Sequence, residues 1–132
     1  MQETNQTKWE TILGQVPSKS NSYLAVPDSE GGRRIIKNER VREYERNFAK
    51  QCRVYRNKYR SRPFKLLLKV FESSVRYDLD GAFKAILDCL QYSKAIKDDN
   101  LCVEIKAEKK IDKSQPRIEY ALIELEPTLS LF

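Results

Sequence analysis

Residues Pro63 to Glu72, PFKLLLKVFE, are dense in apolar side chains and predict the central strand of a β-sheet. A short link, Ser73 to Tyr77, follows this strand, and a helix is expected to begin at Asp80. The apolar residues of that helix recur with the i, i+3, i+4, i+7 spacing of one helical face, at Phe83, Ile86, Leu87 and Leu90. A strand followed by an amphipathic helix is therefore the expected centre of the fold.

The segments on either side predict a mixed sheet. Further strands are expected at Lys8 to Val16, Leu101 to Lys109 and Pro116 to Glu126, and the last two can pair across the turn Ile111 to Gln115. Residues 18–32 are rich in Ser, Asn, Pro and Gly and predict a flexible loop. With a first helix from Asn38 to about Lys58, the 132 residues predict a single α+β domain over 1–132, with about four strands packed with two main helices.

The composition excludes several kinds of active site. The chain contains no histidine, which rules out Ser-His-Asp and Cys-His catalysis and His-ligated zinc. Three widely spaced cysteines, Cys52, Cys89 and Cys102, are expected to be reduced thiols in a cytoplasmic protein. The polar opening MQETNQTKWE predicts no export signal, and no apolar run approaches the ~18 residues of a membrane helix.

The charge is concentrated in one part of the sequence. The formal net charge is +6, but Arg33 to Lys69 holds 14 of the 25 basic residues against three acidic ones. Six basic residues follow the helical period of the first helix on another side from its apolar stripe: Arg42, Arg46, Lys50, Arg53, Arg56 and Arg60. Same-sign charges in one line repel one another, so the pattern favours a surface that binds the DNA backbone over a merely solvated face.

Carboxylates gather around the start of the second helix. Asp78 and Asp80 stand at its N-terminus, where two like charges favour a bound cation, and Lys84 shares a helix flank with Asp80. Asp98-Asp99 precedes the next strand, and the fold could return it beside the first pair. Mg²⁺ held by carboxylates beside a lysine can cut phosphodiesters without histidine. Taken singly, each feature also fits a helix cap, an ion pair or a turn.

At these residues the sequence resembles the RusA family of Holliday junction resolvases. The family pattern D-x-D-N-x-x-K, followed by D-D before a strand, is matched by Asp78 to Lys84 and by Asp98-Asp99. Val16 to Tyr23 (VPSKSNSY) also resembles the Pro-Ser-x-x-N loop of the family. The resemblance implies a dimeric, Mg²⁺-dependent endodeoxyribonuclease of bacteria or their prophages, which resolves four-way DNA junctions by paired symmetric nicks.

The resemblance also assigns the site residues. It implies that Asp78, Asp80 and Asp99 bind the metal, that Lys84 is the essential lysine, and that Lys109 stands where the family keeps a basic residue. Two positions depart from the pattern: Gly81 replaces the Asn, and no aromatic residue precedes Asp98-Asp99. The missing amide removes a possible hydrogen bond to the metal site, which bears on catalytic efficiency.

Two other functions remain open at this stage. Glu104 and Lys106, separated by one residue on an expected strand, resemble the core of a restriction-type nuclease, because alternation puts both on one face. Alternatively, the protein is a non-catalytic nucleic-acid-binding module in which the basic helix makes every contact and the aspartates only cap and turn. No helix-turn-helix spacing or zinc ligands support that reading.

Overall fold

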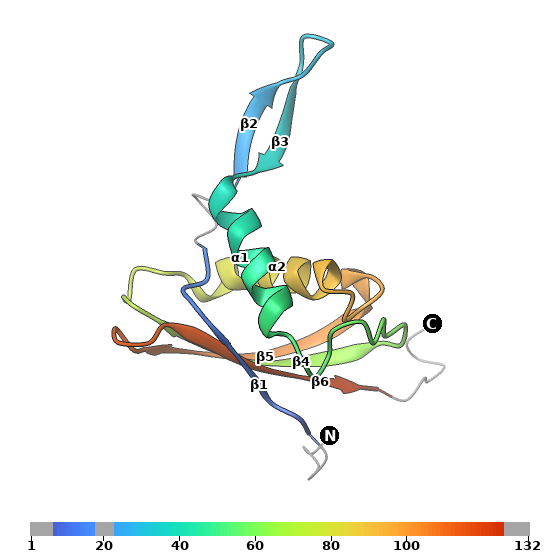
Figure 1. Cartoon of the computed structure of the whole chain (residues 1–132), viewed down its shortest axis with the longest axis vertical. Coiled ribbons are helices and arrows are strands. Elements are labelled where there is room, and N and C mark those ends of the chain that lie inside the picture. The colour runs from blue at the N-terminus through green and yellow to red at the C-terminus, as the bar shows by residue number, and fades with distance from the viewer. Residues whose placement is uncertain (1–6, 18–22, 126–132) are drawn as a thin grey trace.

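In the computed structural model of the protein, the described residues are 7–17 and 23–125. They form nine elements in the order β1 Glu10–Leu13, β2 Tyr23–Pro27, β3 Arg33–Lys37, α1 Glu39–Gln51, β4 Phe64–Glu72, α2 Leu79–Tyr92, the 3₁₀ turn η2 Asp99–Leu101, β5 Cys102–Ile111 and β6 Arg117–Glu124. One sheet has the strand order β1-β6-β4-β5, and β2 and β3 form a separate hairpin (Figure 1). This confirms the predicted α+β domain with a mixed four-stranded sheet and two helices. Neither described helix is long and apolar enough to span a membrane.

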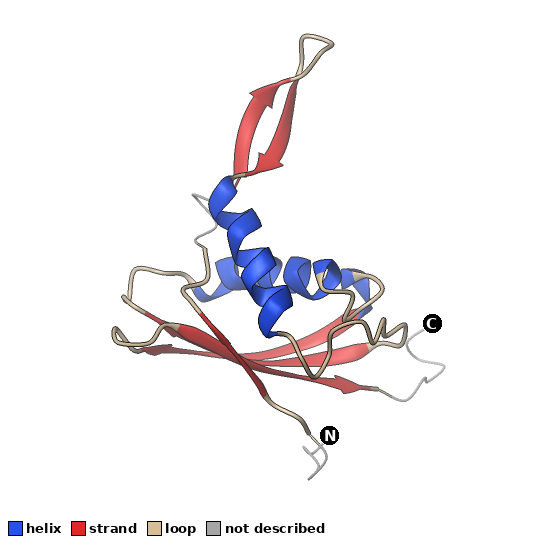
Figure 2. Ribbon diagram, viewed as in Figure 1, coloured by secondary structure: helices blue, strands red, loops and turns tan. Residues whose placement is uncertain are grey.

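The strand β4 is central, as its sequence predicts. It pairs with β5 in parallel and with β6 in antiparallel orientation. Both helices cover the same face of the sheet (Figure 2). Alternate β4 side chains, Phe64, Leu66, Leu68 and Val70, are buried on that face against residues of α1 and α2 such as Phe48, Ile86 and Leu90. The apolar face predicted for α2 therefore packs on the strand that precedes it.

The predicted pairing of the last two strands is wrong. β5 and β6 lie on opposite sides of β4, so that Leu66 is opposite Ile105 on one side and Leu122 on the other. The chain reaches β5 from β4 through α2, and such a crossover sets the two strands parallel and adjacent. Alternation predicts that a segment is a strand but does not identify its neighbours, and here β4, buried on both sides, lies between the two.

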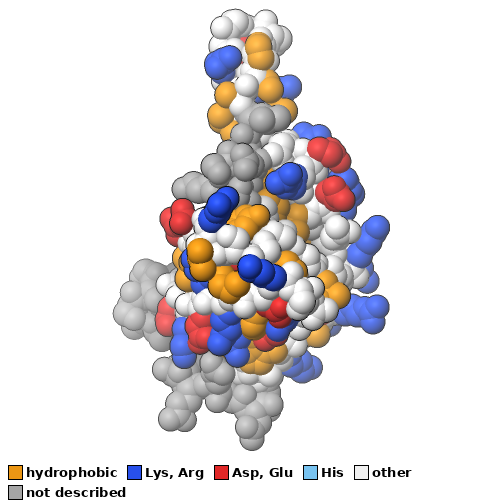
Figure 3. Space-filling view, turned by 90° about the vertical axis from the view of Figure 1, so that its left-hand side faces the viewer, with side chains coloured by type: hydrophobic (Ala, Val, Ile, Leu, Met, Phe, Trp, Pro, Cys, Tyr) orange, Lys and Arg blue, Asp and Glu red, His pale blue; other side chains and the backbone are white. Residues whose placement is uncertain are grey.

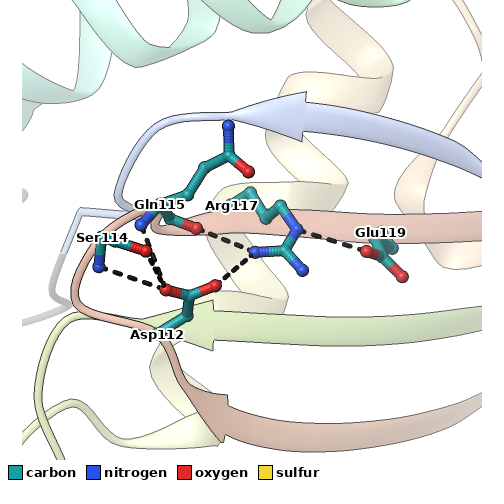
Figure 4. Close-up of polar contacts among 5 residues, drawn as sticks. All are labelled: Asp112, Ser114, Gln115, Arg117 and Glu119. Carbon is teal, nitrogen blue, oxygen red and sulfur yellow. Dashed lines mark hydrogen bonds and ion pairs between the residues drawn. The ribbon is translucent and has the colours of Figure 1, made fainter.

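The loop from β5 to β6 crosses the end of β4 and is held by Asp112. The backbone N–H of Asp112 donates to the carbonyl of Glu72 (2.8 Å). Its carboxylate accepts hydrogen bonds from Ser114 Oγ (2.7 Å) and the N–H of Gln115 (3.2 Å), and it pairs with Arg117 (2.9 Å) (Figure 4). Hydrogen bonds from Ser114 and Arg117 hold the pKa of Asp112 below its usual value. The loop conformation is thus fixed by the hydrogen bond to the end of β4 and by the contacts of the Asp112 carboxylate.

The helix α1 ends at Gln51, seven residues before the predicted end at Lys58. Its start is as predicted, because the Asn38 side chain accepts a hydrogen bond from the N–H of Val41 (3.0 Å). At its other end Cys52 is extended, and Asn57 and Tyr59 have positive φ angles of 63° and 49°, which a right-handed helix excludes. Tyr55 lies beyond the helix but is buried in the core. It therefore extends the apolar spacing of the sequence past the true end of the helix.

The loop predicted at residues 18–32 is wrong at its centre, residues 23–27. Residues 23–27 form β2, which pairs with β3 in a hairpin that projects from the body (Figure 1). The turn between them is built by Asp28, whose carboxylate accepts hydrogen bonds from the N–H groups of Glu30 (2.9 Å) and Gly32 (2.8 Å), and by Gly31 at φ 84°. Turn residues at 28–32 hid the short strand YLAVP before them. Residues 18–22, including most of the predicted Pro-Ser-x-x-N loop, lie outside the described residues.

Candidate active site

Two of the predicted carboxylates stand together at the start of α2. Asp78 is the N-cap residue, with an extended backbone (φ −80°, ψ 136°), and its side chain makes no capping hydrogen bond. Asp80 lies in the first turn, and both residues are exposed. The positive end of the helix dipole stabilises carboxylates at this position. Their oxygens are therefore available to an incoming ligand at the edge where β4 ends.

A third carboxylate, Glu72, lies beneath this helix end and was not predicted from the sequence. It is the last residue of β4, it is 2% exposed, and its Oε2 atom has no hydrogen-bond partner among the described residues. Burial raises the pKa of Glu72 to about 7, Lys109 opposes the shift, and Asp78 adds to it. The signal in the sequence was an ionisable residue at an even-numbered position of a strand whose even-numbered residues are otherwise apolar.

Lys109 joins the neighbouring strand to the link before α2. It lies on β5, opposite Val70, and its Nζ atom donates hydrogen bonds to the carbonyls of Tyr77 (2.9 Å) and Val75 (3.3 Å). The ammonium group therefore both neutralises this end of the sheet and fixes the backbone just before Asp78.

Lys84 lies one turn beyond Asp80 on the exposed side of α2. Its Nζ atom is 3.6 Å from the carboxylate of Asp88, and its side chain is 61% exposed while that of Asp88 is 14% exposed. The flexible ammonium group can reach either along the helix toward Asp88 or back toward its N-terminus. Lys84 therefore lies on the same helix as Asp80, close to the helix end at which Asp78 and Asp80 stand.

Asp98 and Asp99 lie at the other end of α2. Asp98 caps η2 by accepting a hydrogen bond from the N–H of Asn100 (3.0 Å), and Asp99 is the first residue of that turn. The 14 residues of α2 separate them from Asp78, and a helix of this length spans ~21 Å. Among the described residues, no three acidic or cysteine residues are close enough together to hold a metal ion. A single chain therefore brings Asp78 and Asp80 together, but not Asp99.

A comparison with protein families shows to which family the chain belongs and rules against a non-catalytic binding module. Residues 14–123 match the family model described as endodeoxyribonuclease RusA. The chain belongs to the RusA endodeoxyribonuclease family. No curated protein matches the sequence. The RusA family comprises metal-dependent Holliday junction resolvases, so the protein belongs to a family that hydrolyses phosphodiester bonds in branched DNA.

The six basic residues predicted to bind DNA do not form one helical line in this RusA-family chain. Three of them, Arg53, Arg56 and Arg60, follow the end of α1. Arg60 pairs with Glu124 beside the ring of Tyr55. On the helix itself the remaining three are exposed, and one of them is in an ion pair, Arg46 with Glu39 (2.8 Å). Of the six predicted residues, only Arg42, Arg46 and Lys50 therefore lie on α1.

The restriction-type pair lies elsewhere on the RusA-family fold. Glu104 and Lys106 are on one face of β5, as alternation predicts, opposite Lys65 and Leu67 of β4. Their neighbour Ile105 packs against the core beneath the helices, so the pair faces the other side of the sheet. Glu104 forms an ion pair with Lys65 (3.2 Å). This arrangement separates the pair from Asp78 and Asp80.

The donors at the start of α2 suit a metal ion of the kind that binds oxygen ligands, and RusA-family nucleases are metal-dependent. Mg²⁺ takes hard oxygen ligands and is usually held by one or two carboxylates, with water and substrate phosphates completing its shell. Asp78 and Asp80 provide such a pair, and the Asp78 side chain is not used in capping. Two carboxylates at an exposed helix end therefore fit the cation without a third ligand from the same chain.

Proposed function

We propose that the protein resolves four-way DNA junctions by paired, symmetric, Mg²⁺-dependent nicks, as the resemblance to phage and prophage resolvases implies. The observation that carries the proposal is the exposed pair Asp78 and Asp80 at the N-terminus of α2, in a chain of a family that cuts branched DNA. Asp78 and Asp80 hold the cation, and Lys84 faces the phosphate that is cut.

The roles of these side chains follow from their positions. When bound, Mg²⁺ supplies a hydroxide nucleophile and stabilises charge on the phosphoryl oxygens. Asp78 and Asp80 fix the cation at the positive end of a helix dipole, which also attracts the phosphate. Lys84 donates from the adjacent turn to the oxygens on which negative charge develops. No histidine is needed in this scheme, which agrees with a chain that has none.

The proposal places Asp99 in the active site of the partner subunit. Asp78 and Asp99 flank the two ends of α2, so two antiparallel copies of α2 related by a two-fold axis would set each Asp99 near the other protomer's Asp78. The half-buried side chains of Phe83 and Leu87 on α2 support such a contact. A two-fold dimer also provides the two symmetric sites that paired nicks require. In such a homodimer, each site combines Asp78 and Asp80 of one protomer with Asp99 of the other.

The decisive experiment compares a labelled four-way junction with a linear duplex of the same sequence, with and without Mg²⁺. The wild-type protein is expected to nick the junction symmetrically, only with Mg²⁺, and to leave the duplex intact. Asp80→Asn is expected to abolish cleavage but to keep or improve junction binding, because it removes a metal ligand and a charge that repels phosphate.

The control is Glu108→Gln, which neutralises an exposed carboxylate on the sheet face away from the helices. It is expected to cleave at the wild-type rate. Full cleavage by Asp80→Asn would contradict the assigned site, and loss of cleavage in Glu104→Gln with retention in Asp80→Asn would favour the restriction-type reading instead.

A further inference from the structure

A basic pocket opens beside the proposed active site. It has a volume of about 660 Å³ and is lined by three separate segments: the first turn of α1, the link 73–77 and the start of the β5–β6 loop. Each segment contributes one cation, and we call the site formed by Arg40, Arg76 and Lys113 the cation pocket. Figure 3 views the molecule from the side of the 73–77 link and shows Lys and Arg side chains spread across this face.

The three cations are not neutralised by the protein. Arg40, Arg76 and Lys113 are exposed, and none forms an ion pair with another residue of the described chain. Other arginines nearby are paired, for example Arg117 with Asp112 (2.9 Å). Three positively charged side chains line one pocket, and no acidic side chain lines it. The pocket is therefore expected to attract an anion that is not part of the protein.

The backbone that carries these cations is fixed in place. The N–H of Arg76 donates to Ser74 Oγ (3.1 Å), and Lys109 holds the carbonyls on either side of Arg76. The loop that carries Lys113 is fastened by the hydrogen bonds to the Asp112 carboxylate (Figure 4). The third cation, Arg40, belongs to a capped helix. A site whose backbone is already fixed loses less entropy when it binds phosphate than a site on a mobile loop.

The pocket is adjacent to the proposed metal ligands. Arg76 precedes Asp78 by two residues, so their Cα atoms are at most ~7 Å apart. We propose that the cation pocket binds the DNA backbone phosphates next to the one that is cut, one phosphate for each cation, and so sets the position of the strand in the active site. This rests on the proposed junction-cleaving function. The contacts are to phosphate alone, so they position the strand without reading its sequence.

Junction binding measured at several salt concentrations tests the pocket. The probe is a fluorescent four-way junction with a chelator present, so that no cleavage occurs. In Arg76→Gln/Lys113→Gln, the slope of log affinity against log salt is expected to fall by ~0.9 for each phosphate that the variant no longer binds, or ~1.8 for each pocket that holds DNA. The matched control, Lys106→Gln/Lys110→Gln, removes two exposed charges on the sheet face away from the helices and is expected to keep the wild-type slope.

A second variant and a cleavage assay separate this inference from the proposed function. Arg40→Gln alone is expected to lower the slope by ~0.9 per pocket, and it changes neither of the two loops. Wild-type slopes in both pocket variants, folded as judged by circular dichroism, would overturn the cation pocket while leaving junction cleavage intact. Conversely, the pocket variants could lower the salt slope as expected while the wild-type protein never cleaves the junction with Mg²⁺. That result would overturn the proposed function alone.

Discussion

Glu72 shows what a single residue reveals about the site. A carboxylate at the end of the most apolar strand is costly to bury, because taking a charge out of water is repaid only by partners. Its Oε2 atom has no hydrogen-bond partner among the described residues. The ammonium group of Lys109 donates instead to two carbonyls of the link 73–77. The protein therefore holds a carboxyl group whose charged form is unfavourable even with the Lys109 ammonium group nearby.

The pH dependence of stability is the consequence that can be measured. The folded protein raises the pKa of Glu72 from 4.5 to about 7, so the unfolded state loses this proton first as the pH rises. The free energy of unfolding is then expected to fall by on the order of 2 kcal/mol between about pH 5 and pH 8, in the absence of metal and DNA. Glu72→Gln removes this titration. Urea unfolding at several pH values should show the wild type losing stability relative to Glu72→Gln as the pH rises, and parallel profiles would contradict the assignment.

At the scale of elements, the four strands of the main sheet and both helices were predictable, but the hairpin of β2 and β3, the end of α1 and the strand neighbours were not. The start of α1 was found because Asn38 is a local cap, whereas its end depends on a residue from another strand. Glu10 of β1 accepts hydrogen bonds from the N–H groups of Arg53 (2.7 Å) and Val54 (2.9 Å), just beyond the helix. Periodicity carries no information on such distant partners. The same limit applies to the site, because the Asp78 pair was local in sequence while its neighbours Glu72 and Lys109 are set by strand pairing.

The contact between β1 and the end of α1 can be tested by Glu10→Ala. The buried carboxylate also accepts a hydrogen bond from the Tyr120 hydroxyl (2.7 Å), so the substitution leaves two N–H groups without an acceptor and the hydroxyl with only the Cys52 thiol (3.3 Å). Each unsatisfied buried group costs about 1–3 kcal/mol, and a total loss of about 3 kcal/mol or more is expected in urea unfolding. Glu10→Gln, which keeps one acceptor oxygen, should lose less. The exposed control Glu108→Ala should change stability by no more than about 0.5 kcal/mol, and an equal loss in Glu10→Ala and Glu108→Ala would contradict the role of Glu10.

The whole molecule explains why its carboxylates are divided. β4 and β5 run in the same direction, so the chain must return along α2 from the end of one strand to the start of the next. Asp78 and Asp80 precede that return, and Asp99 follows it. The parallel crossover thus separates residues that are only about twenty positions apart in the sequence. In the proposed dimer, the same separation allows each protomer to contribute to both sites.

Mixed dimers test whether the two active sites are shared. If each site takes Asp80 from one protomer and Asp99 from the other, a dimer of one Asp80→Asn and one Asp99→Asn protomer holds one site with both substitutions and one site with none. Such dimers, isolated with two different affinity tags, are expected to regain about half of the wild-type nicking and to cut one strand of the junction rather than two. The Asp80→Asn and Asp99→Asn homodimers should both be inactive. If instead each site lay within one protomer, both sites of the mixed dimer would lack a ligand and the mixture would stay inactive, while cleavage by the Asp99→Asn homodimer would remove Asp99 from the site altogether.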